Sequence, residues 1–359
     1  MDKSAQRELI RVGEEWSIPQ ISRALDGALH NSSPALGFGA TNRTHVDPSI
    51  ALVLATSGST GVAKEVALSA SALLASATAA HQRLKAKPGE RWSLLLPVTH
   101  IAGINVLIRA LELGTDPVDN RDRDDYQDAE YISIVPTQLH RALTGDLKLL
   151  KHLKAAKTVL VGGAAAGLEM IEQARNQKIQ ITTTYGMTEM CGGCIYDQTP
   201  LTGVDMRVNE NGLIQLRGAV MASGYLNQPD SWREVTATGW FTTGDIGEIK
   251  AGKLQVLGRN DDQIISGGMK ISLGLIEIEV MAIFPDQKFM AFSLPDAEWG
   301  ERLCLASDQP IETEQIIALI RGKFGGYAVP KEFHQLRSLP TKGIGKPDRI
   351  RLRALFLAP

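Results

Sequence analysis

Short apolar runs alternate with longer amphipathic stretches along most of the chain. Runs that suit buried strands occur at 50–54, 92–96, 131–135, 158–161 and 179–184. Between them, 69–87 and 101–113 suit helices, because Ser69 can cap the first and Gly114 can follow the second with a positive φ. Strands that alternate with helices predict an α/β fold, and continuous apolar strands predict a sheet covered on both faces.

The pattern changes after about residue 200, where the strands become shorter and glycines more frequent. The segments 212–218 and 252–258 predict β-hairpins, whereas 273–284 and 313–324 predict helices and 289–294 a strand. We therefore predict two domains. Residues 1–259 form a large N-terminal domain of layered α/β sheets plus a β-rich subdomain, and residues 260–359 form a small, mobile α+β domain. The mixed-charge run 121–128 predicts a solvated loop.

Composition excludes several classes of protein. The 359 residues, 43% of them hydrophobic, suffice for two cores, and a net charge of −2 gives no basic field for nucleic acid. No apolar run reaches the length of a membrane span. Three cysteines are too few for a disulfide framework and the first residues are polar, so we expect a cytoplasmic protein. The sequence leaves the oligomeric state open, a homodimer included.

The strongest local motif follows the apolar run at 50–54. It consists of Thr56, Ser57, Gly58, Ser59, Thr60 and Gly61, with Lys64 at its end. Small residues let the backbone approach a phosphate, hydroxyl and amide groups donate to its oxygens, and lysine adds a charge. The motif is not a P-loop, because Glu65 follows Lys64 where a P-loop has serine or threonine. It predicts a triphosphate cradle, with a plain surface turn as the alternative.

Further short motifs follow in one order, and together they carry a resemblance. They are Gly162-Gly163-Ala164, Tyr185-Gly186-Met187-Thr188-Glu189, Thr243-Gly244-Asp245, Gly258-Arg259 with Asp261, Gly267-Gly268 with Lys270, and Gly345-Lys346. With the phosphate motif, they resemble the adenylate-forming enzymes, which include acyl-CoA ligases, luciferases and adenylation domains. The resemblance covers about residues 50–350. It leaves 1–49 without a motif, and the N-terminal domain is short for the family.

The resemblance implies a two-step ligase with ATP, Mg²⁺ and coenzyme A. A small-molecule carboxylic acid is activated as its acyl-adenylate and then passed to a thiol. The implied ATP-binding residues are the phosphate motif with Gly163, Ala164, Tyr185, Gly186, Met187, Thr188, Asp245 and Arg259. Within this set Tyr185 would stack on adenine, Thr188 would donate to the α-phosphate and Asp245 would accept from the ribose, while Glu189 would hold Mg²⁺.

The same resemblance assigns roles in the C-terminal part. Lys346, rather than its neighbour Lys342, would stabilise the charge that develops during adenylation. Asp261 matches the hinge about which the small domain rotates between the two steps. Gly267, Gly268 and Lys270 would then line the approach of CoA.

Two segments are expected to shape the acid pocket. The first, 97–105, contains Thr99, His100 and Gly103, of which His100 would gate the acyl group and is also taken as catalytic; the second is Cys191-Gly192-Gly193. These strings are similar to those of family members that act on an aromatic acid with a second carboxylate, which His100 or Arg109 would bind. A Cys191/Cys194 metal site is disfavoured because Cys304 is the only other thiol. Another acid, transfer to a carrier protein and a non-catalytic nucleotide sensor remain alternatives.

Overall fold

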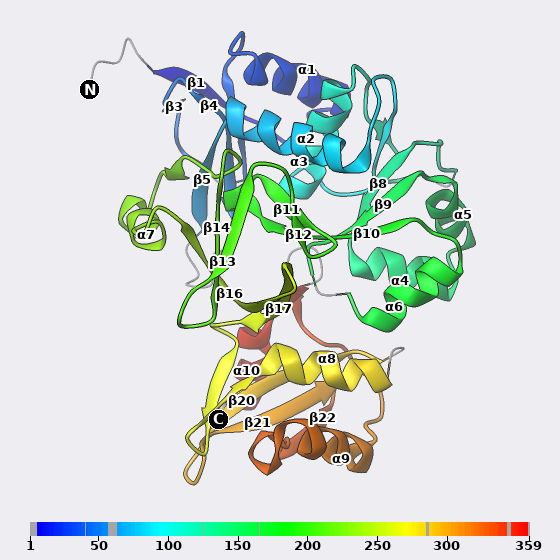
Figure 1. The fold of residues 1–359 in the computed structure, drawn as a ribbon, viewed down its shortest axis with the longest axis vertical. Coiled ribbons are helices and arrows are strands. Elements are labelled where there is room, and N and C mark those ends of the chain that lie inside the picture. The colour runs from blue at the N-terminus through cyan, green and yellow to red at the C-terminus, as the bar shows by residue number, and fades with distance from the viewer. Residues whose placement is uncertain are drawn as a thin grey trace.

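The computed structural model describes residues 6–39, 41–56, 63–123, 125–164, 166–284, 287–342 and 346–357, with the backbone alone at Lys342 and Lys346. A large N-terminal part sits above a smaller C-terminal part in Figure 1. The larger part is built on sheets of six, seven and four strands, and the smaller on a sheet of five strands. The predicted α/β class with several layered sheets is confirmed.

Residues before 50, which carry no motif, build half of the first sheet. Its order is β15-β5-β4-β2-β1-β3, and the strands in chain order are β1 (Arg7–Arg11), β2 (Ala35–Phe38), β3 (His45–Val46), β4 (Ile50–Thr56), β5 (Lys64–Ser69) and β15 (Gly224–Tyr225). Helix α1 (Ile18–Leu29) connects β1 to β2, which run parallel. The Arg7 guanidinium donates to the carbonyls of Ala28, Ser33 and Ile50, so it ties this segment to β4.

The second sheet is covered on both faces, as predicted. Its order is β12-β11-β10-β9-β8-β6-β7, and its strands are β6 (Trp92–Leu94), β7 (Val118–Asp119), β8 (Tyr131–Ile134), β9 (Thr158–Val161), β10 (Ile181–Met187), β11 (Gly192–Tyr196) and β12 (Thr199–Pro200). One core packs it against α2 (Ala70–Leu84) and α3 (Ile101–Glu112), and a second against α4 (Pro136–Thr144), α5 (Leu147–Ala155) and α6 (Leu168–Asn176) (Figure 1).

Helix α2 begins as predicted but ends early. The Ser69 hydroxyl accepts from the amide of Ala72 at 3.1 Å, which makes it the N-cap. The helix stops at Leu84, three residues before the predicted end at 87, because Lys85 adopts a left-handed conformation with φ of 54°.

The predicted hairpins form a four-stranded sheet of order β13-β14-β16-β17, from β13 (Val204–Val208), β14 (Leu213–Gly218), β16 (Phe241–Lys250) and β17 (Lys253–Arg259). Helix α7 (Pro229–Val235) precedes β16. Because β17 ends at Arg259, the chain leaves the larger part at the position of the motif Gly258-Arg259.

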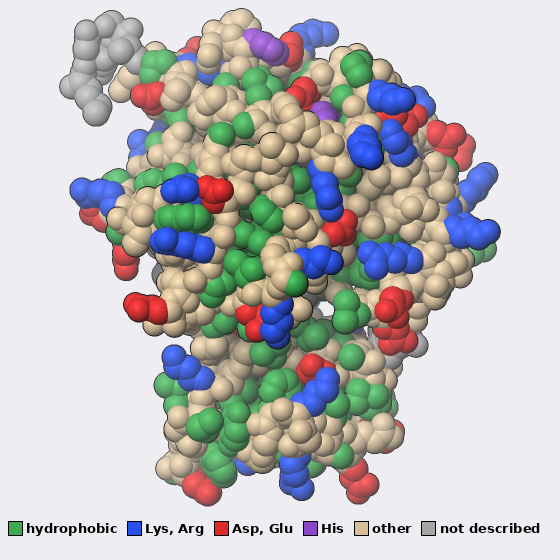
Figure 2. Space-filling model, in the orientation of Figure 1, with side chains coloured by type: hydrophobic (Ala, Val, Ile, Leu, Met, Phe, Trp, Pro, Cys, Tyr) green, Lys and Arg blue, Asp and Glu red, His purple; other side chains and the backbone are tan. Residues whose placement is uncertain are grey.

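The C-terminal part has its own cores. Its strands are β18 (Gln263–Ser266), β19 (Met269–Ser272), β20 (Phe289–Asp296), β21 (Gly300–Ser307) and β22 (Glu332–Gln335), and its helices are α8 (Leu273–Ile283), α9 (Thr313–Phe324) and α10 (Arg349–Leu357). A two-stranded pair, β23 (Thr341–Lys342) with β24 (Lys346–Pro347), precedes α10. The surface is hollowed where the two parts meet (Figure 2). No helix within the described ranges is both long and apolar enough to cross a membrane.

Candidate active site

The phosphate motif joins two antiparallel strands of the first sheet. Thr56 ends β4 and Lys64 opens β5, and the two are register partners, with the Thr56 hydroxyl 3.5 Å from the Lys64 carbonyl oxygen. Ser57, Gly58, Ser59, Thr60 and Gly61 lie outside the described residues. The ends of the motif are therefore held side by side at one edge of the sheet.

Tyr225 connects Lys64 to Glu189. The Lys64 Nζ lies 4.5 Å from the centre of the Tyr225 ring, and the Tyr225 hydroxyl donates to Glu189 Oε1 at 2.7 Å. Burial, and then the charge of Glu189, raise the pKa of Tyr225, so the phenol stays protonated and remains a donor. Tyr225 thus contacts a lysine through its ring and a carboxylate through its hydroxyl.

Thr188 and Glu189 belong to a short 3₁₀ turn (Thr188–Met190) between β10 and β11. The turn is set by glycine on both strands, since a Cβ at Gly186 would lie 1.9 Å from the carbonyl oxygen of its neighbour Gly192. This close approach explains why the motif 185–189 has glycine at its second position. It also joins the predicted ATP-binding strand β10 to the predicted acid wall on β11.

A second set of contacts links Tyr185 to the end of the larger part. The Tyr185 hydroxyl donates to Asp245 Oδ2 at 2.7 Å, and Arg259 Nη1 lies 3.5 Å from Asp245 Oδ1. Arg259 also binds Asp261 through two nitrogens at 2.8 Å each, and this bond, more than any other contact, raises the pKa of Arg259. Three residues from separate motifs therefore meet beside the predicted hinge.

Gly163 and Ala164 follow β9, the strand beside β10. Gly163 has a φ of 84°, which favours glycine, and both residues are exposed. Their role beneath adenine, and that of Tyr185 as its stacking partner, stay predictions.

The two predicted acid-pocket segments contact each other. His100 is the N-cap residue of α3, Thr99 before it is exposed, and a Cβ on buried Gly103 would lie 2.2 Å from the carbonyl oxygen of Pro97. Farther along α3, the Asn105 side chain donates to the Cys191 carbonyl at 2.8 Å. The start of α3 is thereby fixed against the Cys191-Gly192-Gly193 segment of β11.

Arg109 lies in the interior of the larger part. Its side chain is 4% exposed, it donates to the Tyr196 hydroxyl at 3.0 Å, and its guanidinium carbon lies 5.0 Å from the centre of the Trp92 ring. It lies nine positions after His100, roughly 13 Å along the helix. Its role in binding the acid stays a prediction.

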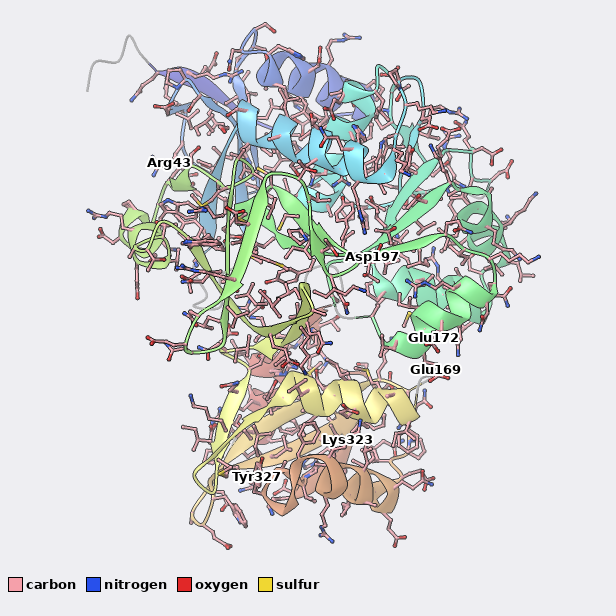
Figure 3. The ribbon with its side chains drawn as sticks, viewed as in Figure 1. Arg43, Glu169, Glu172, Asp197, Lys323 and Tyr327 are labelled. Atoms are coloured by element: carbon pink, nitrogen blue, oxygen red, sulfur yellow. The ribbon has the colours of Figure 1, made fainter. Side chains whose placement is uncertain are left out.

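Several residues around the phosphate motif escaped the sequence analysis. Asn227 accepts from the amide of Glu65 at 2.9 Å and donates to the carbonyl of Ala63 at 2.7 Å. Arg43, at the edge of the first sheet in Figure 3, binds the Glu65 carboxylate at 2.8 Å and the carbonyl of Leu226. The signal in the sequence was weak, because Tyr225 and Asn227 reach this place only through the pairing of β15 with β5.

The residues predicted to line the approach of CoA lie on the hairpin of β18 and β19, whose turn is formed by Gly267 and Gly268. Gly267 has a φ of 57°, and a Cβ there would lie 2.7 Å from the Trp299 ring, whereas a Cβ on Gly268 would meet no atom within 4 Å. Lys270 on β19 is exposed. The side chain of Lys346 lies outside the described residues, so its catalytic role is untested.

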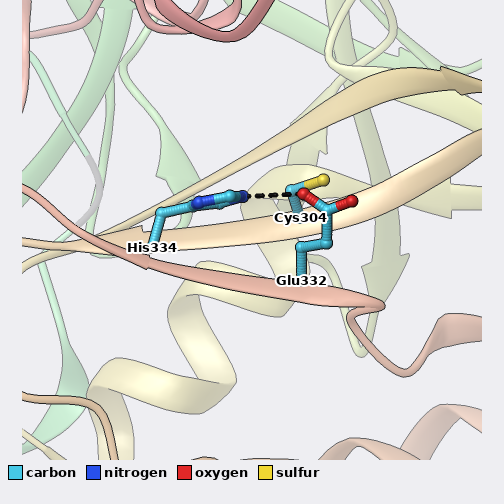
Figure 4. A group of neighbouring side chains, drawn as sticks. All are labelled: Cys304, Glu332 and His334. Atoms are coloured by element: carbon cyan, nitrogen blue, oxygen red, sulfur yellow. Dashed lines mark hydrogen bonds and ion pairs between the residues drawn. The ribbon is translucent and has the colours of Figure 1, made fainter.

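The cysteines offer little to a metal. All three are free and buried, and burial raises the pKa of Cys194 to about 12. Among the described residues, one group could hold an ion, namely Cys304, Glu332 and His334 in the C-terminal part, with ligand atoms within 4.8 Å of one another (Figure 4). Arg302 Nε already lies 2.7 Å from the Glu332 carboxylate. The Arg302 guanidinium therefore already neutralises the carboxylate that a metal ion would need as a ligand.

The chain belongs to the AMP-binding enzyme family, whose model matches residues 14–226 and so includes Lys64, Glu189 and Tyr225. It is 35% identical to a protein of Mycobacterium tuberculosis named probable 2-succinylbenzoate–CoA ligase, with 94% of each chain covered. It is 28% identical to the 2-succinylbenzoate–CoA ligase of Bacillus pumilus, over 85% of this chain and 68% of that protein.

Solved structures agree with the fold. o-Succinylbenzoate CoA synthetase (MenE) of Bacillus subtilis, in complex with its acyl-adenylate intermediate, matches with a TM-score of 0.76 at 21% identity, over 96% of this chain and 83% of that chain. Wild-type MenE of E. coli matches with a TM-score of 0.69 at 25% identity, over 96% and 81%. The resemblance to adenylate-forming enzymes and the prediction of an AMP-forming acid–thiol ligase are confirmed.

Proposed function

We propose that the chain is an ATP-dependent 2-succinylbenzoate–CoA ligase of menaquinone biosynthesis. The observation that carries the proposal is the chain of contacts from Lys64 through Tyr225 to Glu189, which joins the phosphate motif to the turn before the acid wall. The named activity of the relative that is 35% identical over nearly its whole length supports this choice of acid. Three buried, unpaired cysteines fit a reducing cytoplasm.

In the first step a carboxylate oxygen of the acid attacks the α-phosphorus of ATP, and the bond to pyrophosphate breaks. Lys64 holds the triphosphate, and Lys346 stabilises the charge that spreads to the leaving group. Mg²⁺, when bound, shields charge between phosphate oxygens. Glu189 fits this ion because a hard cation in such sites takes one or two protein carboxylates and shares the substrate's oxygens.

In the second step the CoA sulfur, as its thiolate, attacks the carbonyl carbon of the acyl-adenylate, and AMP leaves with the oxygen that linked them. The C-terminal part rotates about Asp261, which brings Gly267 and Gly268 to the site. Gly268 has open space around its Cα and Gly267 is exposed, so the pantetheine can approach the backbone closely. Lys270 beside them is an exposed cation that suits the CoA phosphates.

The acid lies between the start of α3 and the glycines of β11. The expectation that both glycines make room for the acid is wrong at Gly192, which is buried and whose Cβ would lie 2.2 Å from the Asn105 amide nitrogen, so the benzene ring is placed beside the half-buried Gly193. His100 at the helix N-terminus binds the second carboxylate, since helix N-termini favour anions. Arg109 is the less suitable partner because Tyr196 already accepts from it in the interior.

The test is CoA-dependent formation of AMP with 2-succinylbenzoate, benzoate, a medium-chain fatty acid and several amino acids. We expect a preference for 2-succinylbenzoate, and we expect Lys346→Ala to lose pyrophosphate exchange while Lys342→Ala retains it. Turnover of another acid alone would refute the choice of substrate. Absence of pyrophosphate exchange with every acid would refute the ligase and favour the nucleotide sensor.

A further inference from the structure

Arg349, the first residue of α10, joins three separate segments of the C-terminal part. Its Nη1 donates to Asp262 Oδ2 at 2.7 Å, its Nη2 to Glu277 Oε2 at 2.6 Å, and its Nε to the carbonyl of Ala291 at 3.0 Å. All three side-chain nitrogens are therefore bonded. Because a guanidinium is planar and rigid, these bonds fix its orientation as well as its position.

The partners of Arg349 are themselves held in place. Glu277, on α8, is 6% exposed, and its second oxygen accepts from the amide of Ala291 at 2.7 Å. The Arg349 side chain is 17% exposed and that of Asp262 is 27% exposed. Hydrogen bonds between charged groups with so little exposure to solvent are stronger than surface ion pairs. Removal of Arg349 would leave the carboxylate of Glu277 buried without its cation.

Arg349 and its partner Asp262 lie close in sequence to the two residues predicted to act in the mechanism, Lys346 and Asp261. Arg349 lies three residues after Lys346, and Asp262 directly follows the predicted hinge residue Asp261. Lys346 belongs to the strand pair β23–β24, which has only two residues in each strand. Just after this pair, the amide of Asp348 donates to the carbonyl of Pro340 at 3.0 Å. So short a pair is too weak to hold its own place, and it needs an anchor.

We propose that Arg349 is a positioning residue, which ties the segment carrying Lys346 to the hinge so that both move as one body. The inference rests on the proposed function, since the lysine must be placed on the α-phosphate in one step and withdrawn in the other. Binding through Asp262 transmits a rotation at Asp261 directly to the start of α10. Binding through Glu277 makes α8 move with it.

The variants separate the link to the hinge from the link to the core. Asp262→Asn weakens only the first, Arg349→Met removes both, and Arg353→Met is the matched control. Arg353 is one turn farther along α10, its side chain is 39% exposed, and its two contacts, to Ser293 and Glu301, are each 3.4 Å long. Pyrophosphate exchange is measured with 2-succinylbenzoate, together with the melting temperature and hydrogen exchange in peptides spanning 340–348.

We expect Asp262→Asn to lower the kcat of exchange about 10-fold and Arg349→Met about 100-fold, at unchanged KM for ATP, because a displacement of about 1 Å suffices for such losses. The double variant should be no slower than Arg349→Met, and hydrogen exchange in 340–348 should rise in both single variants but not in Arg353→Met. A kcat of Asp262→Asn within twofold of the wild type would overturn the proposal. So would a raised KM at unchanged kcat, or a loss shared equally by Arg353→Met. A wild type without acid-dependent exchange defeats the proposed function instead, and hydrogen exchange alone then decides the coupling.

Discussion

Removing one hydroxyl, in Tyr225→Phe, tests whether Glu189 must be oriented by its neighbour. The substitution keeps the ring, which is 3% exposed and packs edge-on against Trp232 at 5.0 Å. It removes only the donor to the Glu189 carboxylate. A hydrogen bond to a charged group contributes about 1.5–3 kcal/mol, and about 1.4 kcal/mol corresponds to a factor of ten in rate. We therefore expect pyrophosphate exchange to fall roughly 10- to 150-fold.

The assay measures exchange as a function of Mg²⁺ concentration, because a misaligned Glu189 should raise the Mg²⁺ concentration needed for half-maximal rate. The matched control is Tyr131→Phe. Its hydroxyl also donates to a glutamate, Glu90, at 2.6 Å, but on β8 away from the site. Both variants should lose a similar amount of stability, and only Tyr225→Phe should lose exchange.

Two results would refute this reasoning. If Tyr225→Phe exchanged pyrophosphate within threefold of the wild type at every Mg²⁺ concentration, the bond to Glu189 would be structural only. If Tyr131→Phe lost exchange equally, the loss would follow from stability and would carry no information on the ion.

Three further outcomes follow from the geometry. Asp245→Asn should raise the KM for ATP about 10-fold with little change in kcat, because a ribose contact is made equally before and during reaction. Gly186→Ala should destabilise the fold by about 3 kcal/mol, since its Cβ would lie 1.9 Å from a backbone oxygen. Gly268→Ala has open space but a φ of 79°, so it should lower the free energy of unfolding by only about 1–2 kcal/mol. Urea unfolding measures both losses. Burial raises the pKa of Glu277 to about 7, opposed by Arg349 and the backbone amide that faces it and reinforced by the nearby charge of Asp262. Folded Glu277 is therefore charged only as the pH rises through about 7, so Arg349→Met should destabilise the fold by about 1 kcal/mol more at pH 8 than at pH 5.5 in the same assay, and an equal loss at both would contradict this.

The motifs that the sequence shows most clearly are those whose residues are required by local backbone geometry. Glycine at Gly186 is required by the close approach of the next strand, and glycine at Gly163 by its positive φ, so both motifs show in the sequence. The strand 158–161 and the helix 313–324 were predicted with the bounds that the structure has, because their apolar spacing and flanking residues act within the same segment. The early end of α2 was missed, since lysine carries no signal for a left-handed conformation.

The residues that escaped prediction act across the fold, and Tyr225 and Arg349 show why. Tyr225 reaches Glu189 only because β15, a strand of two residues, returns to the edge of β5 some 160 positions later in the chain. Arg349 stands in a run of arginines that resembles a solvated tail, yet its side chain is mostly buried between α8 and the residue after the predicted hinge. A sequence motif identifies the residues that would contact the substrate. The residues that hold those groups in position are determined by tertiary packing. A charged residue in such a position looks the same in the sequence as one at the surface, because only its surroundings in the fold differ.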